Sequence, residues 1–292
     1  MKLRCRDRVI EFPRRPLVMG IVNINDDSFS GDGTLDVDEA VSQAGQMIEE
    51  GADIIDVGAE SARTNREAIA DAEEVGRLRP FLERFDELVT SCQRWDDEQL
   101  WPPLLSVNTW REPVVEEVLA TGQVDILNDI GGLPDPANAE ICAKTGATLI
   151  LMHTVGAPKV SHTHQHWEDV MGELERYFRE KIKLAVGAGL PEEQILIDPG
   201  IDFAKQRDDN LTIYRDLKRL QQFERPILLP VSRKTVIGDV LGIEEAKERD
   251  AGTMASIASG MTRGANVFRV HEVAGTARVV RTLQAVVATC RD

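Results

Sequence analysis

The chain has 292 residues, of which 42% are hydrophobic and 29% charged, and its formal net charge at pH 7 is −16. This length fits one large domain or two small ones, because α/β barrels reach about 250 residues as a single domain. The acidic balance argues against a nucleic-acid partner, and no apolar run approaches the roughly 18 residues that span a membrane. A charged N-terminal segment and four scattered cysteines predict a cytoplasmic protein without a disulfide framework.

Short apolar runs alternate with longer amphipathic stretches along the chain. The runs predict strands at residues 17–23, 53–60, 104–108, 125–129, 148–153, 195–200, 227–232 and 267–271. The stretches between them predict helices at residues 36–50, 66–92, 112–121, 135–145, 167–188, 208–222, 246–263 and 273–289. Near-continuous hydrophobicity is typical of strands buried on both faces, as in a parallel sheet. The pattern predicts an α/β fold in which residues 1–292 form a single (β/α)8 TIM barrel domain, with a doubly wound open sheet as the alternative.

Three segments lie outside this alternation. Residues 2–12, which precede the first predicted strand, are expected to form a short β-hairpin that closes the floor of the barrel. Residues 91–103 come before a strand, hence at the bottom of a barrel, and we expect a structural role for them. Residues 154–166 follow a strand at the top face, where they could form an active-site flap.

Polar residues end every predicted strand, and in a barrel these ends meet at one mouth. Asn108, Asn128 and Asp198 follow the third, fourth and sixth strands. Together they offer amide donors, amide acceptors and one carboxylate, which can accept two parallel N–H bonds from a flat heterocycle. This part of the mouth therefore predicts a site for a nitrogen-rich ring.

The last two strands carry basic residues instead. Lys234, Arg269 and His271 follow the seventh and eighth strands, where barrels often hold phosphate. Arginine binds phosphate oxygens in a bidentate manner, and lysine acts as a compact point charge. The mouth is thus expected to hold a heterocycle on one side and an anionic leaving group on the other.

The segment after the first strand, residues 23–34, is polar and punctuated by glycine. It is either a surface turn or a mobile lid. As a lid, it would place Phe29 over a ring, and Asp27 or Asn23 would hold a hydrated Mg²⁺ against phosphate.

Several segments in order, from about residue 16 to residue 285, resemble the dihydropteroate synthases of the pterin-binding barrel family. These segments are MGIVNINDDSFS, GADIIDVGAES, SVNTW, ILNDIGGLPDP, LMH, ILIDPGIDFAK, PVSRKTVIG, RDAGT and FRVHEV. The resemblance implies that para-aminobenzoate attacks the exocyclic methylene of 6-hydroxymethyl-7,8-dihydropterin diphosphate. Pyrophosphate then leaves with Mg²⁺, and 7,8-dihydropteroate forms for folate biosynthesis. The resemblance also implies a homodimer.

The resemblance assigns roles residue by residue. It implies that the pterin is contacted by Asn128, Asp198 and Lys234, with Met152 in the wall of the pocket. It implies that the diphosphate and the metal are held by Asn23, Arg269 and His271. The residues that it implies around the aminobenzoate are Ser61, Arg63, Lys234 and Thr235. The residues expected to act in catalysis are Lys234, Asp198, Asn108 and Asp27.

The chain departs from the family pattern at several of these positions. The third-strand motif ordinarily carries Asp where Asn108 stands, and the usual Ser of the lysine motif is Thr235. Two glycines of the sixth-strand loop are replaced by Asp202 and Ala204. Further departures fall at residues 25 and 26 of the first loop and at residues 62 and 64 of the second. The pterin floor is therefore better preserved than the aminobenzoate side.

Asn108 bears on whether the resemblance extends to catalysis. Departure of pyrophosphate leaves positive charge on the dihydropterin ring, which a carboxylate stabilises more than an amide does. The difference of roughly 1–2 kcal/mol corresponds to about a 5- to 30-fold slower reaction, not to its loss.

Two alternatives stay open. One is a pterin-binding paralogue with weak or no synthase activity, which the altered loops motivate. The other is a methyltetrahydrofolate-binding methyltransferase relative. Lys234 and the RVH segment argue against the latter, because a methyl donor has no diphosphate to hold.

Overall fold

A closed ring of parallel strands forms the centre of the molecule. The computed structural model describes residues 1–26, 33–61, 67–160 and 165–289. Within them the barrel strands are β3 (Leu17–Asn23), β4 (Ile54–Gly58), β5 (Leu104–Asn108), β6 (Ile126–Asp129), β7 (Thr148–Met152), β8 (Ile195–Asp198), β9 (Leu228–Pro230) and β10 (Val267–Val270). They are hydrogen-bonded in the order β8-β7-β6-β5-β4-β3-β10-β9, and a parallel bridge between Ile197 and Ile227 joins the two end strands. The predicted TIM barrel is confirmed, and the open sheet was the wrong alternative.

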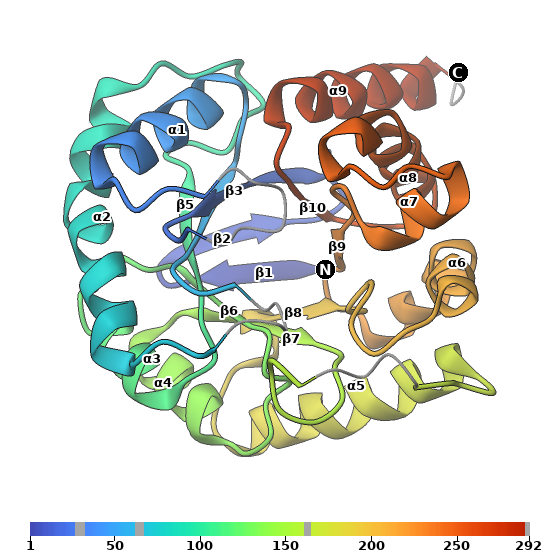
Figure 1. The fold of residues 1–292 in the computed structure, drawn as a ribbon, viewed down its shortest axis with the longest axis horizontal. Helices are drawn as coiled ribbons and strands as arrows, with labels where there is room; N and C mark the ends of the chain where they lie inside the picture. The colour runs from blue at the N-terminus through green and yellow to red at the C-terminus, as the bar shows by residue number, and fades with distance from the viewer. Residues whose placement is uncertain (27–32, 62–66, 161–164, 290–292) are drawn as a thin grey trace.

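Helices surround this barrel (Figure 1). They are α1 (Val37–Glu49), α2 (Asp71–Ser91), α3 (Glu112–Leu119), α4 (Ala137–Thr145), α5 (Val170–Gly187), α6 (Arg207–Asp216), α7 (Thr235–Leu241), α8 (Asp250–Thr262) and α9 (Val273–Thr289). Short 3-10 turns lie at Glu192–Gln194, Leu217–Phe223 and Ala246–Arg249. The sequence had not predicted α7, which begins directly after the loop that follows β9. None of the described helices combines the length and apolar character that crossing a bilayer requires.

Side chains that point outward from the strands pack against the helices, and those that point inward fill the barrel. Because side chains alternate along a strand, each strand contributes to both. The lowest inward layer is apolar and consists of Ile54, Leu104, Ile126, Ile150, Leu196, Leu228 and Val267. The hairpin of β1 (Lys2–Cys5) and β2 (Arg8–Glu11) covers this layer with Leu3, Cys5, Ile10 and Phe12. The predicted hairpin is confirmed, and its buried side chains close the floor.

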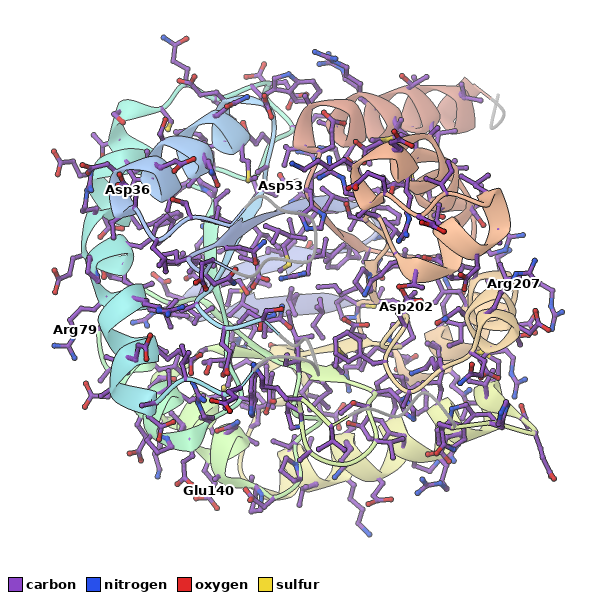
Figure 2. All side chains as sticks on the ribbon, in the orientation of Figure 1. Asp36, Asp53, Arg79, Glu140, Asp202 and Arg207 are labelled. Carbon is purple, nitrogen blue, oxygen red and sulfur yellow. The ribbon has the colours of Figure 1, made fainter. Side chains whose placement is uncertain are left out.

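The segment of residues 91–103 holds the bottom of the barrel together, as predicted. Gln99 donates through Nε2 to the carbonyl oxygens of Ile48 and Ala52, both at 2.8 Å. Asp53, labelled in Figure 2, precedes β4 and forms a buried ion pair with Arg15 at 2.8 Å. The N–H of Leu100 donates to the same carboxylate at 2.7 Å. The side chains of Gln99 and Asp53 at this end are thus occupied by structural contacts.

Candidate active site

Above the apolar layer, the inward positions of the strands become polar. Two residues further along the strands stand Asp56, Ser106, Asn128, Met152, Asp198 and Arg269, and the next inward layer contains Asn108, Ser232 and His271. Except for Asp56 and Ser106, which lie behind them, these residues line a cavity of about 600 Å³ at the carboxyl ends of the strands. The inward-pointing side chains of the same strands are therefore aliphatic at the floor of the barrel, and they are amides, carboxylates and a guanidinium nearer to its mouth.

The structure brings most of the predicted site residues to this one cavity. Its lining includes Asn23, Ser61, Asn108, Asn128, Met152, Asp198, Lys234, Thr235, Arg269 and His271. The other three predicted residues, Asp27, Phe29 and Arg63, lie outside the described part of the chain. Residues from 157 to 160 of the long top-face segment also line the cavity, whereas residues 161–164 lie outside the description.

Asp198 and Asn128 form a deep acceptor surface. Asp198 is 3% exposed and Asn128 is 2% exposed. One carboxylate oxygen of Asp198 accepts the N–H of Gly200 at 2.7 Å, and burial raises the pKa of this carboxyl to about 6 against the opposing effects of Gly200, Lys234 and Lys205. Oδ1 of Asn128 is buried and has no partner among the described residues, so it presents an unsatisfied acceptor.

Gly200 is required where it stands. Its φ of +67° lies in the left-handed region, and a Cβ at this position would come within 2.0 Å of the carbonyl oxygen of His153. The close approach allows the N–H of Gly200 to reach Asp198, which fixes the carboxylate toward the cavity. His153 itself is fully buried and does not line the cavity, although its position at a strand end resembled that of a site residue.

Asp56 organises the polar layer, a role that the sequence analysis missed. It is fully buried and accepts three side-chain hydrogen bonds: from Oγ of Ser106 at 2.6 Å, from Nδ2 of Asn128 at 3.1 Å and from Nε of Arg269 at 2.7 Å. Because Nδ2 of Asn128 donates to Asp56, Oδ1 of the same amide is left for a ligand. The only signal in the sequence is an acidic residue within the otherwise apolar run IIDVG.

The cationic side of the cavity consists of Lys234 and Arg269, with His271 nearby. Lys234 immediately precedes α7, its Nζ donates to the carbonyl oxygen of Ile201 at 2.9 Å, and burial lowers its pKa. Arg269 uses Nε for Asp56, and its two terminal nitrogens make no hydrogen bond to another described residue. Nδ1 of His271 lies 2.8 Å from Oγ of Ser232. A guanidinium oriented in this way can present its terminal nitrogens to an anion.

Lys205 is a second buried lysine that the sequence analysis did not assign to the site. Its Nζ lies 2.8 Å from Nδ1 of His153 and donates to the carbonyl oxygen of Phe203 at 2.9 Å. Burial lowers the pKa of Lys205 to about 7, while nearby Asp198 opposes that change. Burial, followed by the charge of Lys205, lowers the pKa of His153 to about 2, so the imidazole is neutral and can accept from the ammonium.

Asn108 stands between two neighbours across the sheet, Gly58 on β4 and Asn128 on β6. Its side chain makes no hydrogen bond to another described residue, and it lines the cavity beside Asn128. The amide is thus available to a ligand. Asp56, one layer deeper, provides the carboxylate nearest to this position along β4.

The long top-face segment reaches the site through Lys159. Its Nζ donates to Oε1 of Glu60 at 3.0 Å and to the carbonyl oxygen of Ser61 at 3.2 Å. Glu60 also pairs with Arg111 at 3.0 Å. These contacts tie Lys159 to the loop after β4, beside the cavity.

The described residues contain no group of three or more His, Cys, Asp and Glu side chains that could hold a metal ion. Asn23 lines the cavity on the side of Arg269 and His271. One amide oxygen is a poor cage by itself, but it fits Mg²⁺, which keeps several waters and usually binds through substrate phosphates. The donor chemistry of the cavity is therefore compatible with a metal that arrives with a diphosphate.

Comparisons with known proteins agree with this geometry. Residues 19–271 match the family described as pterin binding enzyme. Dihydropteroate synthase of Escherichia coli (strain K12) is 36% identical over 271 residues, covering 92% of this chain and 91% of that protein. The solved structure of Xanthomonas albilineans dihydropteroate synthase with 4-aminobenzoic acid is 35% identical, with a TM-score of 0.84 and 98% of both chains covered.

The same X. albilineans enzyme in complex with 7,8-dihydropteroate is 32% identical, with a TM-score of 0.80 and 98% of both chains covered. Sequence and fold are thus shared over nearly the whole length of this chain with dihydropteroate synthases. The chain belongs to the pterin-binding enzyme family, as a transferase of the dihydropteroate synthase type.

Proposed function

We propose that the protein transfers the pterinylmethyl group of 6-hydroxymethyl-7,8-dihydropterin diphosphate to the amine of para-aminobenzoate and releases pyrophosphate. The observation that carries the proposal is the single cavity in which Asp198 and Asn128 present acceptors while Lys234 and Arg269 present positive charge. The likeness to dihydropteroate synthases over nearly the whole chain supports the same reaction.

In this proposal the ring binds at the floor. The free oxygen of Asp198 and Oδ1 of Asn128 accept hydrogen bonds from ring N–H and amino groups, a pairing that buried acceptors favour. Met152, which is 2% exposed, packs against the face of the ring as part of the wall. Asn108 donates or accepts at the ring edge beside Asn128.

The diphosphate binds on the opposite side, where Arg269 and Lys234 stabilise the charge that develops as it leaves. The amine nitrogen forms a bond to the exocyclic carbon, the carbon–oxygen bond breaks, and its electron pair leaves with pyrophosphate. The amine then loses a proton. Magnesium, when bound, would neutralise charge on the diphosphate, and Asn23, which lines the cavity, would be one of its ligands.

The second substrate approaches from the mouth, because the ring occupies the floor. Ser61 and Thr235 line this outer part of the cavity, together with Lys234, which borders both substrates. The roles of Asp27 in catalysis and of Phe29 and Arg63 in binding are part of the same proposal. The proposal also includes a homodimer, a cytoplasmic location and the action of residues 1–292 as a single domain.

The proposal is tested by release of pyrophosphate in the presence of Mg²⁺. The purified protein is expected to release pyrophosphate only when both substrates are present. A folded sample that releases none contradicts the proposal. Calorimetry then separates the pterin-binding paralogue, which binds the pterin diphosphate without turnover, from the methyltransferase relative, which binds a methylated folate instead.

A further inference from the structure

The carboxylate of Asp202 covers the N-terminal end of α7. Oδ2 accepts the backbone N–H of Thr235 at 2.5 Å, and Oδ1 accepts that of Val236 at 3.4 Å. The side chain of Asn210 donates to Oδ1 at 3.0 Å and accepts the N–H of Asp202 at 2.9 Å. These contacts from two different elements fix one negative charge in this place.

This fixed charge faces the outer part of the cavity. Asp202 and Thr235 both line the cavity, and Asp202 comes from the loop between β8 and α6 (Figure 2). Thr235 is exposed, whereas Asp198 at the floor is 3% exposed, so the pair lies nearer to the mouth. In the proposed reaction the second substrate directs its amine inward, and the substituent at its far end points toward this mouth.

Two of the described cations that line the mouth are paired with carboxylates, and Nζ of the third, Lys234, donates to the carbonyl oxygen of Ile201 at 2.9 Å. Lys159 pairs with Glu60 at 3.0 Å, and Arg207 pairs with Asp208 at 3.0 Å. The backbone N–H groups that begin α7, which could otherwise receive an anion, donate to Asp202. An anionic substituent at this place therefore meets a fixed carboxylate and displaces existing hydrogen bonds.

We infer that Asp202 makes the second-substrate end of the cavity prefer arylamines with an uncharged para substituent over 4-aminobenzoate. The inference rests on the proposed transfer to an arylamine and names the class of arylamine that binds best. An amide or ester can donate or accept a hydrogen bond beside Asp202 without bringing a second negative charge. Two carboxylates at close range repel each other by the Coulomb interaction, and this repulsion is stronger in a partly buried site than in water.

The test is calorimetric binding of 4-aminobenzoate and 4-aminobenzamide to the full chain. The protein is saturated with 6-hydroxymethylpterin and magnesium pyrophosphate, which together cannot react, so binding is measured without turnover. The unmodified chain is expected to bind the amide about tenfold more tightly than the acid. Asp202→Asn should strengthen binding of the acid about tenfold and change binding of the amide less than about twofold.

Two further variants make the result decisive. Asp202→Gly also removes the charge and suits the φ of +68° at this position, so it replaces Asp202→Asn if that variant unfolds. Glu140→Gln removes one charge from exposed Glu140 on α4, away from the cavity, and should change neither affinity.

The inference is overturned if the unmodified chain binds the acid as tightly as the amide. It is also overturned if the Asp202 variants shift both affinities equally, or if neither arylamine binds. Failure of the proposed function would appear separately, as a lack of pyrophosphate release from the reactive pterin diphosphate with either arylamine.

Discussion

The carboxylate of Asp56 lies 2.7 Å from Nε of Arg269, although the two residues are 213 positions apart in the chain. Asp56 thereby connects the two halves of the cavity, because its second partner there is Nδ2 of Asn128 at 3.1 Å. One carboxylate fixes both the guanidinium that faces the leaving group and the amide that faces the ring. Positioning of this kind raises the rate only if the supporting contacts are rigid. The contacts of Asp56 meet this condition because the side chain is fully buried.

Asp56→Asn is therefore expected to weaken binding of the pterin diphosphate about 10- to 100-fold, since charge-assisted hydrogen bonds are worth roughly 1.5–3 kcal/mol. The side-chain NH₂ group of an asparagine at this position would face the N–H donor of either Asn128 or Arg269, so that one hydrogen bond would be lost. Calorimetry measures the affinity, and far-ultraviolet circular dichroism verifies folding.

Asp53→Asn is the matched control for that variant, because Asp53 forms a buried ion pair with Arg15 at the other end of the same strand. It should lower the melting temperature and leave the affinity unchanged. Equal losses of affinity in the two variants would show that Asp56 acts only through stability.

Asn108→Asp should raise kcat by about 5- to 30-fold, because a carboxylate stabilises positive charge on the ring more than an amide does. The side chain of Asn108 has no described hydrogen-bond partner to lose. Steady-state pyrophosphate release measures the change. A slower Asn108→Asp variant would contradict this account of the position.

Replacement of asparagine by aspartate on the neighbouring strand should be harmful instead of beneficial. Asn128→Asp would place a second carboxylate at the 3.1 Å distance that now separates Nδ2 of Asn128 from Asp56. Repulsion between them should weaken binding of the pterin at least tenfold.

Binding of the pterin should depend on pH through Asp198, whose pKa burial raises to about 6. The ionised carboxylate is the form that accepts from ring donors, and it is present above that pH. Affinity is therefore expected to be retained above pH 6 and to fall about tenfold per unit as the pH drops below it. Competition binding measures the affinity between pH 5 and pH 6.5. This range lies below the pKa of Lys205, which is about 7, so that Lys205 stays protonated while Asp198 titrates.

Asp198→Asn supplies the comparison for the pH series. The amide cannot titrate, so this variant should bind more weakly at pH 6.5 and show a flatter profile below it. Identical profiles in the two proteins would assign the pH dependence to the ligand or to another group.

The lower barrel should contribute stability without contributing to activity. Leu3→Ala removes a fully buried side chain from the hairpin that closes the floor, and such truncations cost about 2–5 kcal/mol. Val9→Ala in the same hairpin changes a side chain that is 49% exposed, and it should cost less than about 0.5 kcal/mol. Urea unfolding measures both, and kcat/KM should be unchanged. A large loss of activity in Leu3→Ala at a temperature where it is folded would contradict the division of the barrel into two layers.

The sequence predicted the strands, the barrel and the polar mouth because these depend on local alternation and hydrophobic runs. It did not predict the roles of Asp56 or Lys205, because each role depends on partners from distant strands. Asp56 looks like one polar residue in a buried run until Arg269 is placed beside it.

Helix α7 was missed for a similar reason. Its first two described N–H groups are accepted by Asp202, which lies 33 and 34 residues earlier and belongs to another loop. A local search for a capping residue before Thr235 finds Lys234, whose side chain makes no cap. Long-range capping of this kind has no local sequence signal.

The most direct measurement of the central claim is a crystal structure of the chain with 6-hydroxymethyl-7,8-dihydropterin diphosphate and Mg²⁺. The account predicts the ring within hydrogen-bond distance of Asp198 and Asn128, and the diphosphate against Arg269 and Lys234. A ring bound outside this cavity, or a diphosphate directed away from Arg269, would contradict it.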